Sequence, residues 1–297
     1  MADVIFIGLS LSSILLLIAL GLTIIYGAMG VINMAHGELV MIGAYTAVMT
    51  GIYLGFNLIA ALPVAFLVAG GIGFLMERAV IRHLYGRLLD TLLATWGIAI
   101  ILKQAIRLEF GLSFLDIHID GLGTGLQNVA IPAFLNQPWS IGGIEVQSYR
   151  TFIILLTVFL ALVTWFLMYR TSYGIQVRAI MRNADMAAAC GIDVKKVSSL
   201  TFAYGSGLAG VAGVMMAGFK TVSPDMGSSL VVDGFLVVVV GGVGSLLGSV
   251  ASAGFLGQVN GIFATYSNDI LARAVVFGVV ILIIMWRPQG LFSFKGR

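Results

Sequence analysis

The strongest constraint on this chain is how little charge it carries over long stretches of its sequence. Between Val4 and Met76 the only acidic or basic residue is Glu38. A helix needs about 20 consecutive apolar residues to cross the hydrocarbon core of a bilayer, whereas the strands of a membrane barrel alternate. With breaks at glycine-containing turns, this stretch predicts three membrane helices, at about 4–26, 31–53 and 58–76.

The composition of the whole chain points the same way. Hydrophobic residues make up 60% of it and charged residues 10%, and the mean hydropathy is +1.06, whereas a soluble domain carries roughly 25% charged residues. We therefore expect an all-α integral membrane protein, a polytopic helical bundle of about eight or nine transmembrane helices. Its first span is expected to be retained, since Asp3 is the only early charge. A single cysteine, Cys190, excludes an intramolecular disulfide framework.

Charged loops divide the rest of the chain and set its expected orientation. Loops rich in Lys and Arg lie on the cytoplasmic side, so the net charge of +3 reflects topology rather than nucleic-acid binding. Residues 77–90, 171–197 and 287–297 are then inside, and the acidic segment 109–149 is periplasmic. The chain forms one transmembrane domain, 1–297, with an outer N-terminus and about nine crossings, or eight if 230–244 is re-entrant. Lys103 and Arg107 fit this orientation least well, because they fall at the outer end of a membrane helix, where basic residues are not expected.

Small residues recur along two of the later spans. Gly205, Ala209 and Gly213 stand four residues apart, as do Gly257 and Gly261. Residues at this spacing share one helix face, and small ones let two backbones approach closely in lipid. The pattern predicts tight helix packing, and no internal sequence repeat is evident beside it.

Two groups of residues at membrane depth are candidates for a substrate pathway. The first is Asn33 with His36 and Glu38, and the second is Asp233 with Gly241 and Gly242, which end the apolar run after it. Ionisable side chains within a membrane are costly and mark pathways, and broken glycine-rich helices form many transporter sites. The alternative is that these groups only bond to neighbouring helices.

The sequence lacks the motifs of an enzyme. One cysteine and three scattered histidines offer no metal site, and no His-Glu-x-x-His motif is present. Gly241-Gly-Val-Gly244 is not continued as a phosphate-binding loop. We expect no cofactor in this chain, so ATP and Mg²⁺, if they drive it, are bound by another polypeptide.

The segment Arg178–Lys196 is polar and alanine-rich in an otherwise apolar chain. Residues 179–189 favour a helix, and Gly191 is placed to end it. A short rigid helix between two spans suits docking of a motor subunit, while contact with lipid headgroups is the alternative. The charged residues that could make such contacts are Arg178, Arg182 and Asp185.

Five motifs spread along essentially the whole chain carry a family resemblance. They are Asn33-Met-Ala-His-Gly-Glu38, the loop Arg178–Gly191, Gly205–Gly213, Gly241–Gly244 and the tail Arg287-Pro-Gln-Gly-Leu-Phe292. Together they resemble the permeases of branched-chain amino-acid ABC importers, the LivH type. Thr91-Leu-Leu-Ala-Thr-Trp-Gly97, Asn183–Ala189 and Gly290–Gly296 resemble more closely the urea-importer branch, the UrtB type.

The resemblance implies a multi-pass subunit of the bacterial inner membrane. It would pair with a second homologous permease, two cytoplasmic ABC ATPases on the alanine-rich loops and a periplasmic substrate-binding protein. The expected substrate is urea or a short amide; a branched-chain amino acid is the alternative, and an ATP-independent urea or amide channel is the alternative of another class. In the loop, the resemblance implies that the ATPase contacts involve the residues that match the family's coupling-loop pattern, Arg178, Asn183, Ala187, Ala188 and Gly191. The loop lacks the leading Glu of the Glu-Ala-Ala signature of other importers, with Asp185 nearby instead.

Overall fold

The computed structural model describes residues 2–107, 125–141 and 144–292. Its α-helices are α1 (Ala2–Met29), α2 (His36–Leu54), α3 (Leu58–Ala79), α4 (Leu88–Arg107), α6 (Ser148–Arg170), α7 (Ser172–Arg182), α8 (Ala184–Ala189), α9 (Val194–Ala217), α10 (Met226–Gly241), α11 (Leu246–Tyr266) and α12 (Asp269–Trp286). Two short 3-10 helices, η1 (Ile81–Leu84) and η3 (Ala133–Leu135), and the antiparallel strands β1 (Pro138–Ile141) and β2 (Ile144–Gln147) complete the described elements.

The all-α membrane fold is confirmed. Seven of the described helices are long and apolar enough to cross a bilayer, and α10 and most of α12 form two shorter apolar helices. The small hairpin β1–β2 lies in the predicted periplasmic segment. Three acidic residues of that segment, Glu109, Asp116 and Asp120, lie outside the described residues.

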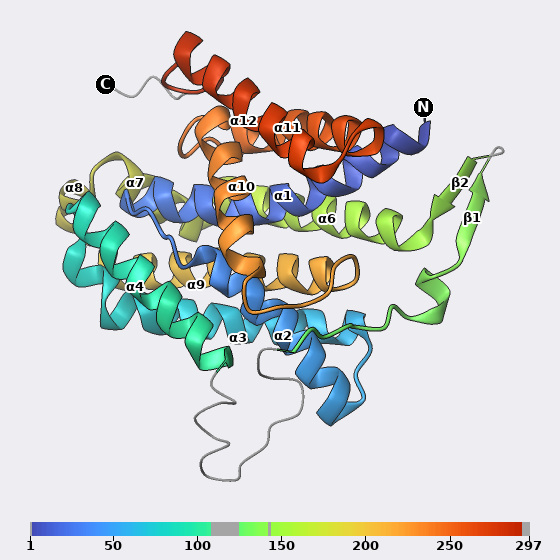
Figure 1. The fold of residues 1–297 in the computed structure, drawn as a ribbon. Coiled ribbons are helices and arrows are strands. Elements are labelled where there is room, and N and C mark those ends of the chain that lie inside the picture. The colour runs from blue at the N-terminus through green and yellow to red at the C-terminus, as the bar shows by residue number, and fades with distance from the viewer. Residues whose placement is uncertain (1, 108–124, 142–143, 293–297) are drawn as a thin grey trace.

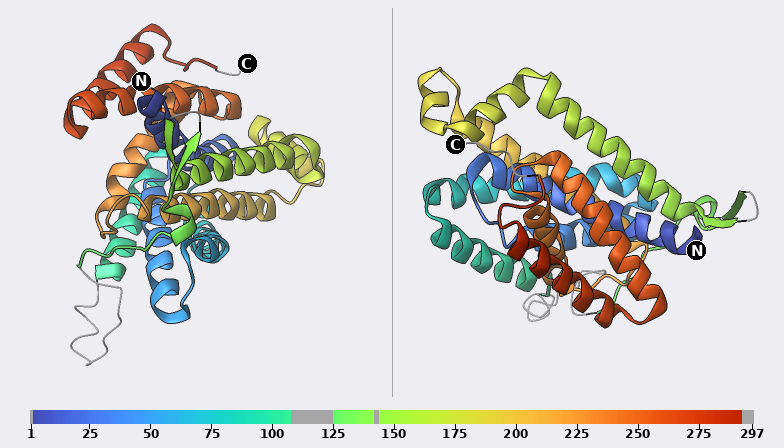
Figure 2. Two further views of the ribbon diagram at one scale, coloured as in Figure 1. Left: turned by 90° about the vertical axis from the view of Figure 1, so that its right-hand side faces the viewer. Right: turned by 90° about the horizontal axis from the view of Figure 1, so that it is seen from above.

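The long helices lie side by side, with α7 and α8 at one end of the bundle and the hairpin and N-terminus at the other (Figures 1 and 2). We call these the α8 end and the hairpin end. Within the most apolar 18-residue stretch of each long helix, the share of buried residues falls from 83% in α9 to 17% in α4. Helix α9 is therefore central, packed by α1, α2 and α3, and α4 is peripheral.

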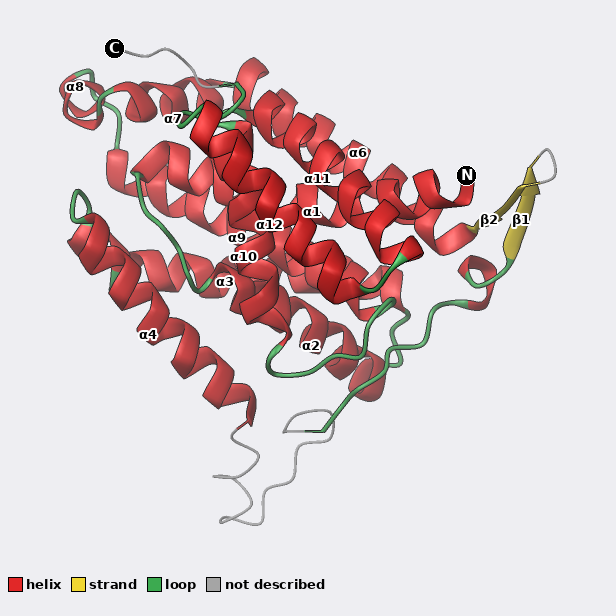
Figure 3. Ribbon diagram, turned by 45° about the horizontal axis from the view of Figure 1, so that its top comes forward, coloured by secondary structure: helices red, strands yellow, loops and turns green. Residues whose placement is uncertain are grey.

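Two partly buried non-helical segments interrupt the bundle, at 30–35 and 218–225; Asn33 and Val222 are buried in them, whereas Gly30 and Asp225 are exposed. Both belong to the loop stretches drawn in green in Figure 3. The predicted helix 31–53 therefore begins only at His36, and the segment predicted from 230 begins earlier, at Met226. Backbone polar groups inside a membrane must find protein partners. The second interruption finds one in Gln127, which exchanges two backbone hydrogen bonds with Val222, at 3.0 and 2.8 Å.

The first interruption follows from local sequence. Gly30 has a φ of 64°, which glycine adopts without strain, and its N–H bonds to the Tyr26 carbonyl at 2.8 Å to end α1. The Asn33 side-chain oxygen then accepts the Ala35 N–H at 3.1 Å, and the Asn33 carbonyl accepts the His36 N–H at 3.3 Å. Asn33 thus builds the turn from which α2 starts.

Helices α1, α2 and α3 pack on α9, α10 and α11 in an inverted arrangement. Helix α1 runs from the hairpin end to the α8 end and α9 runs back (Figure 1), and α1 packs on α11 as α9 packs on α3. Gly21 and Gly205 face each other, since a Cβ on either would meet the carbonyl oxygen of the other, and Gly37 and Gly227 do the same where α2 crosses α10. Many transporters share this inverted arrangement, which is not evident as an internal repeat of the amino-acid sequence.

Replacing a glycine at the α2–α9 crossing tests this packing. A Cβ on Gly43 would lie 2.6 Å from Gly210 Cα, whereas a Cβ on Gly71 of α3 would meet open space. We expect Gly43→Ala to destabilise the fold by about 1–3 kcal/mol through overpacking. Thermal unfolding in detergent measures the effect, with Gly71→Ala as the matched control. Equal melting temperatures for the two variants would contradict the packing described.

Candidate functional site

The two interrupted segments meet where α2 and α10 begin. A Cβ on Gly227 would lie 2.6 Å from the Gly37 carbonyl oxygen and 2.7 Å from Glu38 Oε2. The two helix starts therefore touch backbone to backbone in the interior of the bundle. Broken helices that meet within the membrane form the substrate sites of many transporters.

A network of charged side chains lies at this crossing. The Glu38 side chain is 3% exposed, and its Oε1 lies 3.8 Å from Lys103 Nζ of α4. Lys103 also donates a hydrogen bond to Ser228 Oγ at 2.6 Å, and its Nζ lies 3.5 Å from Asp225 Oδ1. Ser228 in turn donates to Glu38 Oε1 at 3.3 Å. Arg107 donates to both oxygens of Asp225, at 2.6 and 2.8 Å. The network joins α2, α4 and the start of α10, and it explains why two cations stand near the end of α4.

Unpaired buried polar atoms gather in the same region. Six buried side-chain N or O atoms among the described residues have no hydrogen-bond partner, and four of them are Asn33 Nδ2, His36 Nδ1, Glu38 Oε2 and the Tyr45 hydroxyl. Each such atom costs free energy in a low-dielectric interior. All four atoms belong to one segment, 33–45, which makes this segment a candidate for contact with a polar solute.

His36 and Asn33 also have structural roles. Both are fully buried, and His36 Nε2 lies 3.2 Å from the Ile18 carbonyl oxygen of α1. A Cβ on Gly21 would lie 3.0 Å from the imidazole ring, so His36 fits into the α1–α9 crossing. Their suggested contact with substrate stays a prediction.

The other predicted pathway residues lie away from Glu38. Asp233 pairs with Arg273 of α12, Oδ2 to Nη2 at 3.3 Å. Gly241 and Gly242 end α10 and pack on α11 and the tail, where the Phe292 N–H bonds to the Gly241 carbonyl at 3.2 Å. These three residues are therefore not brought together with Asn33, His36 and Glu38.

The alanine-rich loop forms two helices rather than the single one predicted over 179–189. The chain breaks at Asn183, which is extended and whose Oδ1 accepts the Met186 N–H at 3.0 Å to cap α8. Gly191, with a φ of 84°, ends the loop as expected. Capping by Asn, which competes with helix formation, was the signal for this break.

The outer surface of the loop is exposed and its inner surface is anchored. Arg182, Asp185 and Ala188 are exposed, as is Met186 at 62%, whereas Ala187 is buried. The remaining predicted contact residue, Arg178, is partly buried and lies over the Tyr169 ring, its Cζ 5.0 Å from the centroid. The loop thus offers a free face at the α8 end.

Met181 links this loop to the rest of the bundle. Its methyl carbon lies over two glycines, 2.6 Å from a Cβ built on Gly27 of α1 and 3.2 Å from one built on Gly244. Val177 and Ile180 of the same helix pack in a cluster with residues of α1 and α9. A displacement of α7 would therefore press on the end of α1 and on the turn between α10 and α11.

The predicted small-residue stripes lie at helix crossings. Gly205 faces α1, and a Cβ on Gly213 would meet the Val40 carbonyl of α2. Gly257 lies against Ser12, and a Cβ on Gly261 would lie 2.5 Å from Gly8 Cα. Ala209 is fully buried in the same core.

A bundle of apolar helices, with two broken segments and a charged network at their crossing, defines a polytopic membrane permease. Residues 4–285 match the family described as branched-chain amino acid transport system / permease component, and the chain belongs to this family. It is a multi-pass protein of the inner membrane.

The chain is similar to several named permeases. It is 31% identical over 301 residues to the high-affinity branched-chain amino acid transport system permease protein LivH of Escherichia coli (strain K12), covering 96% of this chain and 93% of the relative. It is 29% identical to BraD of Pseudomonas aeruginosa, a permease of the same description, covering 96% and 94%. It is 25% identical to LivM of Escherichia coli (strain K12), covering 95% and 68%. No solved structure matches the chain. These relatives support the branched-chain alternative and give no support to the closer likeness to urea permeases expected from the sequence.

Removing one partner of the Glu38–Lys103 pair tests the network. Lys103→Gln leaves Glu38 buried beside fewer cations, so we expect the free energy of unfolding to fall by about 2 kcal/mol. This is less than the loss for a fully buried pair. The double variant Glu38→Gln/Lys103→Gln should recover most of this stability. Chemical or thermal unfolding in detergent measures the double variant and each single variant, Lys103→Gln and Glu38→Gln.

The control for this cycle is Arg87→Gln, because Arg87 and Asp90 form an exposed pair at 3.5 Å. Arg87→Gln should lower the free energy of unfolding by less than about 1 kcal/mol. Strictly additive effects of the two single substitutions would show that Glu38 and Lys103 do not interact.

Proposed function

We propose that this chain is the translocation subunit of an ATP-driven importer of branched-chain amino acids. Its family membership supports the transporter class, and the named relatives, LivH and BraD, are branched-chain amino acid permeases. The substrate itself is inferred from the chemistry of the α2–α10 crossing.

The observation that carries this proposal is the close pair of Glu38 and Lys103 at the crossing. A free amino acid carries an ammonium and a carboxylate group close together. Glu38 would take the ammonium and Lys103 the carboxylate, each exchanging its internal partner for the substrate. Urea has no charge, so a path for urea needs hydrogen-bonding groups and gains nothing from a buried ion pair.

The aliphatic side chain of the substrate needs an apolar wall. Val40 and Met41 follow Glu38 on α2 and are fully buried, and Val231 of α10 approaches Gly37, with its Cβ 2.9 Å from a Cβ built there. Burial of a leucine or isoleucine side chain against such groups contributes roughly 1.5–3 kcal/mol. The crossing thus offers both polar and apolar recognition.

The transporter needs partners that this chain does not supply. One of two ABC ATPases would bind the free face of α7–α8, and the other would bind the corresponding loop of a second permease; both would hold ATP and Mg²⁺. A periplasmic binding protein would deliver substrate to the hairpin end. A second, related permease would complete the path, which is supported by the similarity of this chain to both LivH and LivM. Closure of the ATPases would displace α7, and Met181 would transmit the movement to Gly27 and Gly244.

Uptake into proteoliposomes tests the substrate. The chain would be reconstituted with its partner subunits, with labelled leucine or labelled urea outside and ATP inside. We expect ATP-dependent leucine uptake that isoleucine and valine inhibit and urea does not. In Glu38→Gln, uptake should fall at least about tenfold, since loss of one partner of a desolvated charge contact costs 2–5 kcal/mol.

The matched control is Asp90→Asn, which removes an exposed carboxylate at the α8 end and should leave uptake unchanged. ATP-dependent urea uptake that leucine does not inhibit would replace the amino-acid assignment by the urea assignment. Urea flux that persists without ATP would mean a channel and would overturn the importer reading.

A second variant tests the coupling route. Met181→Ala removes the side chain that spans Gly27 and Gly244, so we expect ATP hydrolysis to continue while leucine uptake falls. The ratio of ATP hydrolysed to leucine transported should rise several-fold. Met285→Ala, whose side chain is 78% exposed on α12, is the control. An unchanged ratio in Met181→Ala would exclude this side chain from the coupling route.

A further inference from the structure

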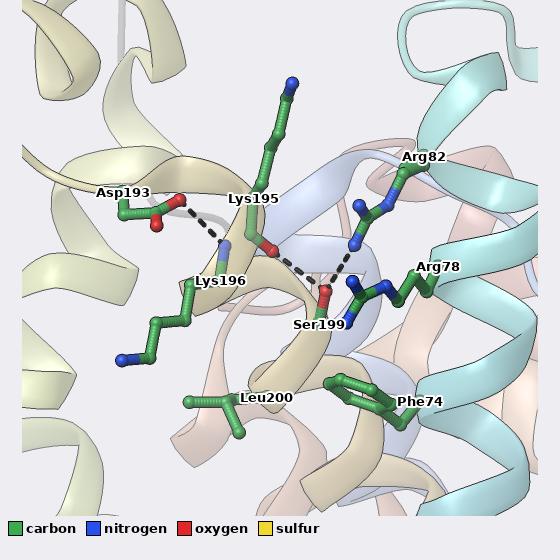
Figure 4. Close-up of a pocket in the computed structure, with 8 residues that line it drawn as sticks. All are labelled: Phe74, Arg78, Arg82, Asp193, Lys195, Lys196, Ser199 and Leu200. Atoms are coloured by element: carbon green, nitrogen blue, oxygen red, sulfur yellow. Dashed lines mark hydrogen bonds between the residues drawn. The ribbon is translucent and has the colours of Figure 1, made fainter.

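A basic cavity lies at the α8 end, separate from the α2–α10 crossing. It has a volume of about 440 Å³, within the range of roughly 300–1,000 Å³ typical of small-molecule sites. Its walls come from α3, η1 and the first turns of α9 (Figure 4). The lining residues are Phe74, Arg78, Arg82, Asp193, Lys195, Lys196, Ser199 and Leu200.

The arginines converge on the floor of the cavity. In Figure 4 the guanidinium groups of Arg78 and Arg82 point toward Ser199, and Arg82 donates to Ser199 Oγ at 2.9 Å. Arg82 is held by the buried carboxylate of Glu77 at 3.1 Å, which also accepts from Ser199 and from the Tyr85 hydroxyl. Burial, followed by the bond to Glu77, raises the pKa of Tyr85, so it remains a donor. Arg82 is therefore fixed in place.

Positive charge exceeds negative charge at this cavity. Glu77 offsets Arg82, and the Asp193 carboxylate accepts the Lys196 backbone N–H at 3.0 Å to cap α9. Within the described residues, Arg78, Lys195 and Lys196 have no acidic partner within 4.0 Å. Arg82 Nε is buried and has no hydrogen-bond acceptor in the described part of the chain. The cavity therefore has donors and charge suited to an anion.

One edge of the cavity is apolar. Phe74 and Leu200 line it, and Leu200 is 44% exposed. Leu75 and Leu67, on the same helix as Phe74, are 63% and 70% exposed on the membrane span. A ligand with an anionic head and an aliphatic tail would match this arrangement, because cations at the cytoplasmic surface attract anionic lipid headgroups.

We propose that the cavity between α3 and α9 binds a phosphate group, carried by an anionic phospholipid of the inner leaflet. Arg78 and Arg82 hold the phosphate, Lys195 adds charge, and Leu200 and Phe74 contact the start of an acyl chain. The lipid would link α3 to the N-terminal end of α9, the helix that directly follows the α7–α8 loop. The proposal does not depend on which substrate the permease carries.

Binding of labelled phosphatidylglycerol tests the site. The full-length chain, purified with its partner subunits, would be placed in phosphatidylcholine nanodiscs, and the labelled lipid titrated in. Arg78→Gln/Lys195→Gln should lower the apparent affinity about 25-fold, since each cation near an anionic surface is worth roughly a factor of five. Arg87→Gln, at the same end but paired with Asp90, should bind as the wild type does. Equal binding by the double variant and the wild type would overturn the site.

Inorganic phosphate and Leu200→Ser distinguish a lipid from a free anion. For a lipid site, Leu200→Ser weakens binding of phosphatidylglycerol and leaves binding of inorganic phosphate unchanged. If inorganic phosphate displaces the labelled lipid completely at low millimolar concentration and Leu200→Ser has no effect, the lipid assignment is wrong. Both substituted side chains of the double variant lack ion-pair partners in the described residues, so loss of folding is not expected, and a melting curve checks it.

Discussion

Backbone polar groups within a bilayer must be bonded to protein, and most of this architecture depends on how that requirement is met at two breaks. The segments 30–35 and 218–225 leave the helical path, and their buried residues include Asn33 and Val222. Neighbouring backbone packs against them: Gly37 touches Gly227 at the starts of the helices that follow, and Gln127 pairs with Val222. In lipid there is little hydrophobic gain from bringing helices together, so close backbone contact between glycines is the main source of packing energy.

The same breaks decide where charge can stand. A helix that begins inside the bundle brings its first residues to a place that other side chains can reach, and here these residues include Glu38 and Ser228. Lys103 and Arg107 of α4 reach them from outside the central core. The cost of burying Glu38 is offset within this network, yet one of its oxygens stays unpaired. A contact of this kind can be exchanged for a substrate group more readily than a fully satisfied ion pair.

Some of this was predictable from sequence and some was not. The spans, the polar loops and the terminating Gly191 follow from runs of apolar residues and from glycine chemistry, which are local. The start of α2 at His36 was missed because the apolar run continues through Val31 and Ile32. The pairing of Lys103 and Arg107 with residues far along the chain, and the inverted arrangement of α1, α2 and α3 against α9, α10 and α11, depend on long-range contacts that periodicity does not encode. Asp233 and Gly241 were predicted as a second group, apart from Glu38, and their printed contacts are with Arg273, α11 and the C-terminal tail.

Buried polar side chains of this chain differ in how fully they are hydrogen-bonded. Most buried hydroxyl groups of this chain bond to a carbonyl of their own helix, as Thr46 and Thr50 do at 2.8 and 2.7 Å, and so need no solute. Asn33, His36 and Glu38 differ, because each has one group bonded within the protein and another that is free. The bonded group fixes the orientation of the side chain, and the free group is then presented in a fixed direction. Preorganised polar groups of this kind would bind a solute without first being reordered, which is why the proposed pathway is placed at the side chains that stand at the start of α2.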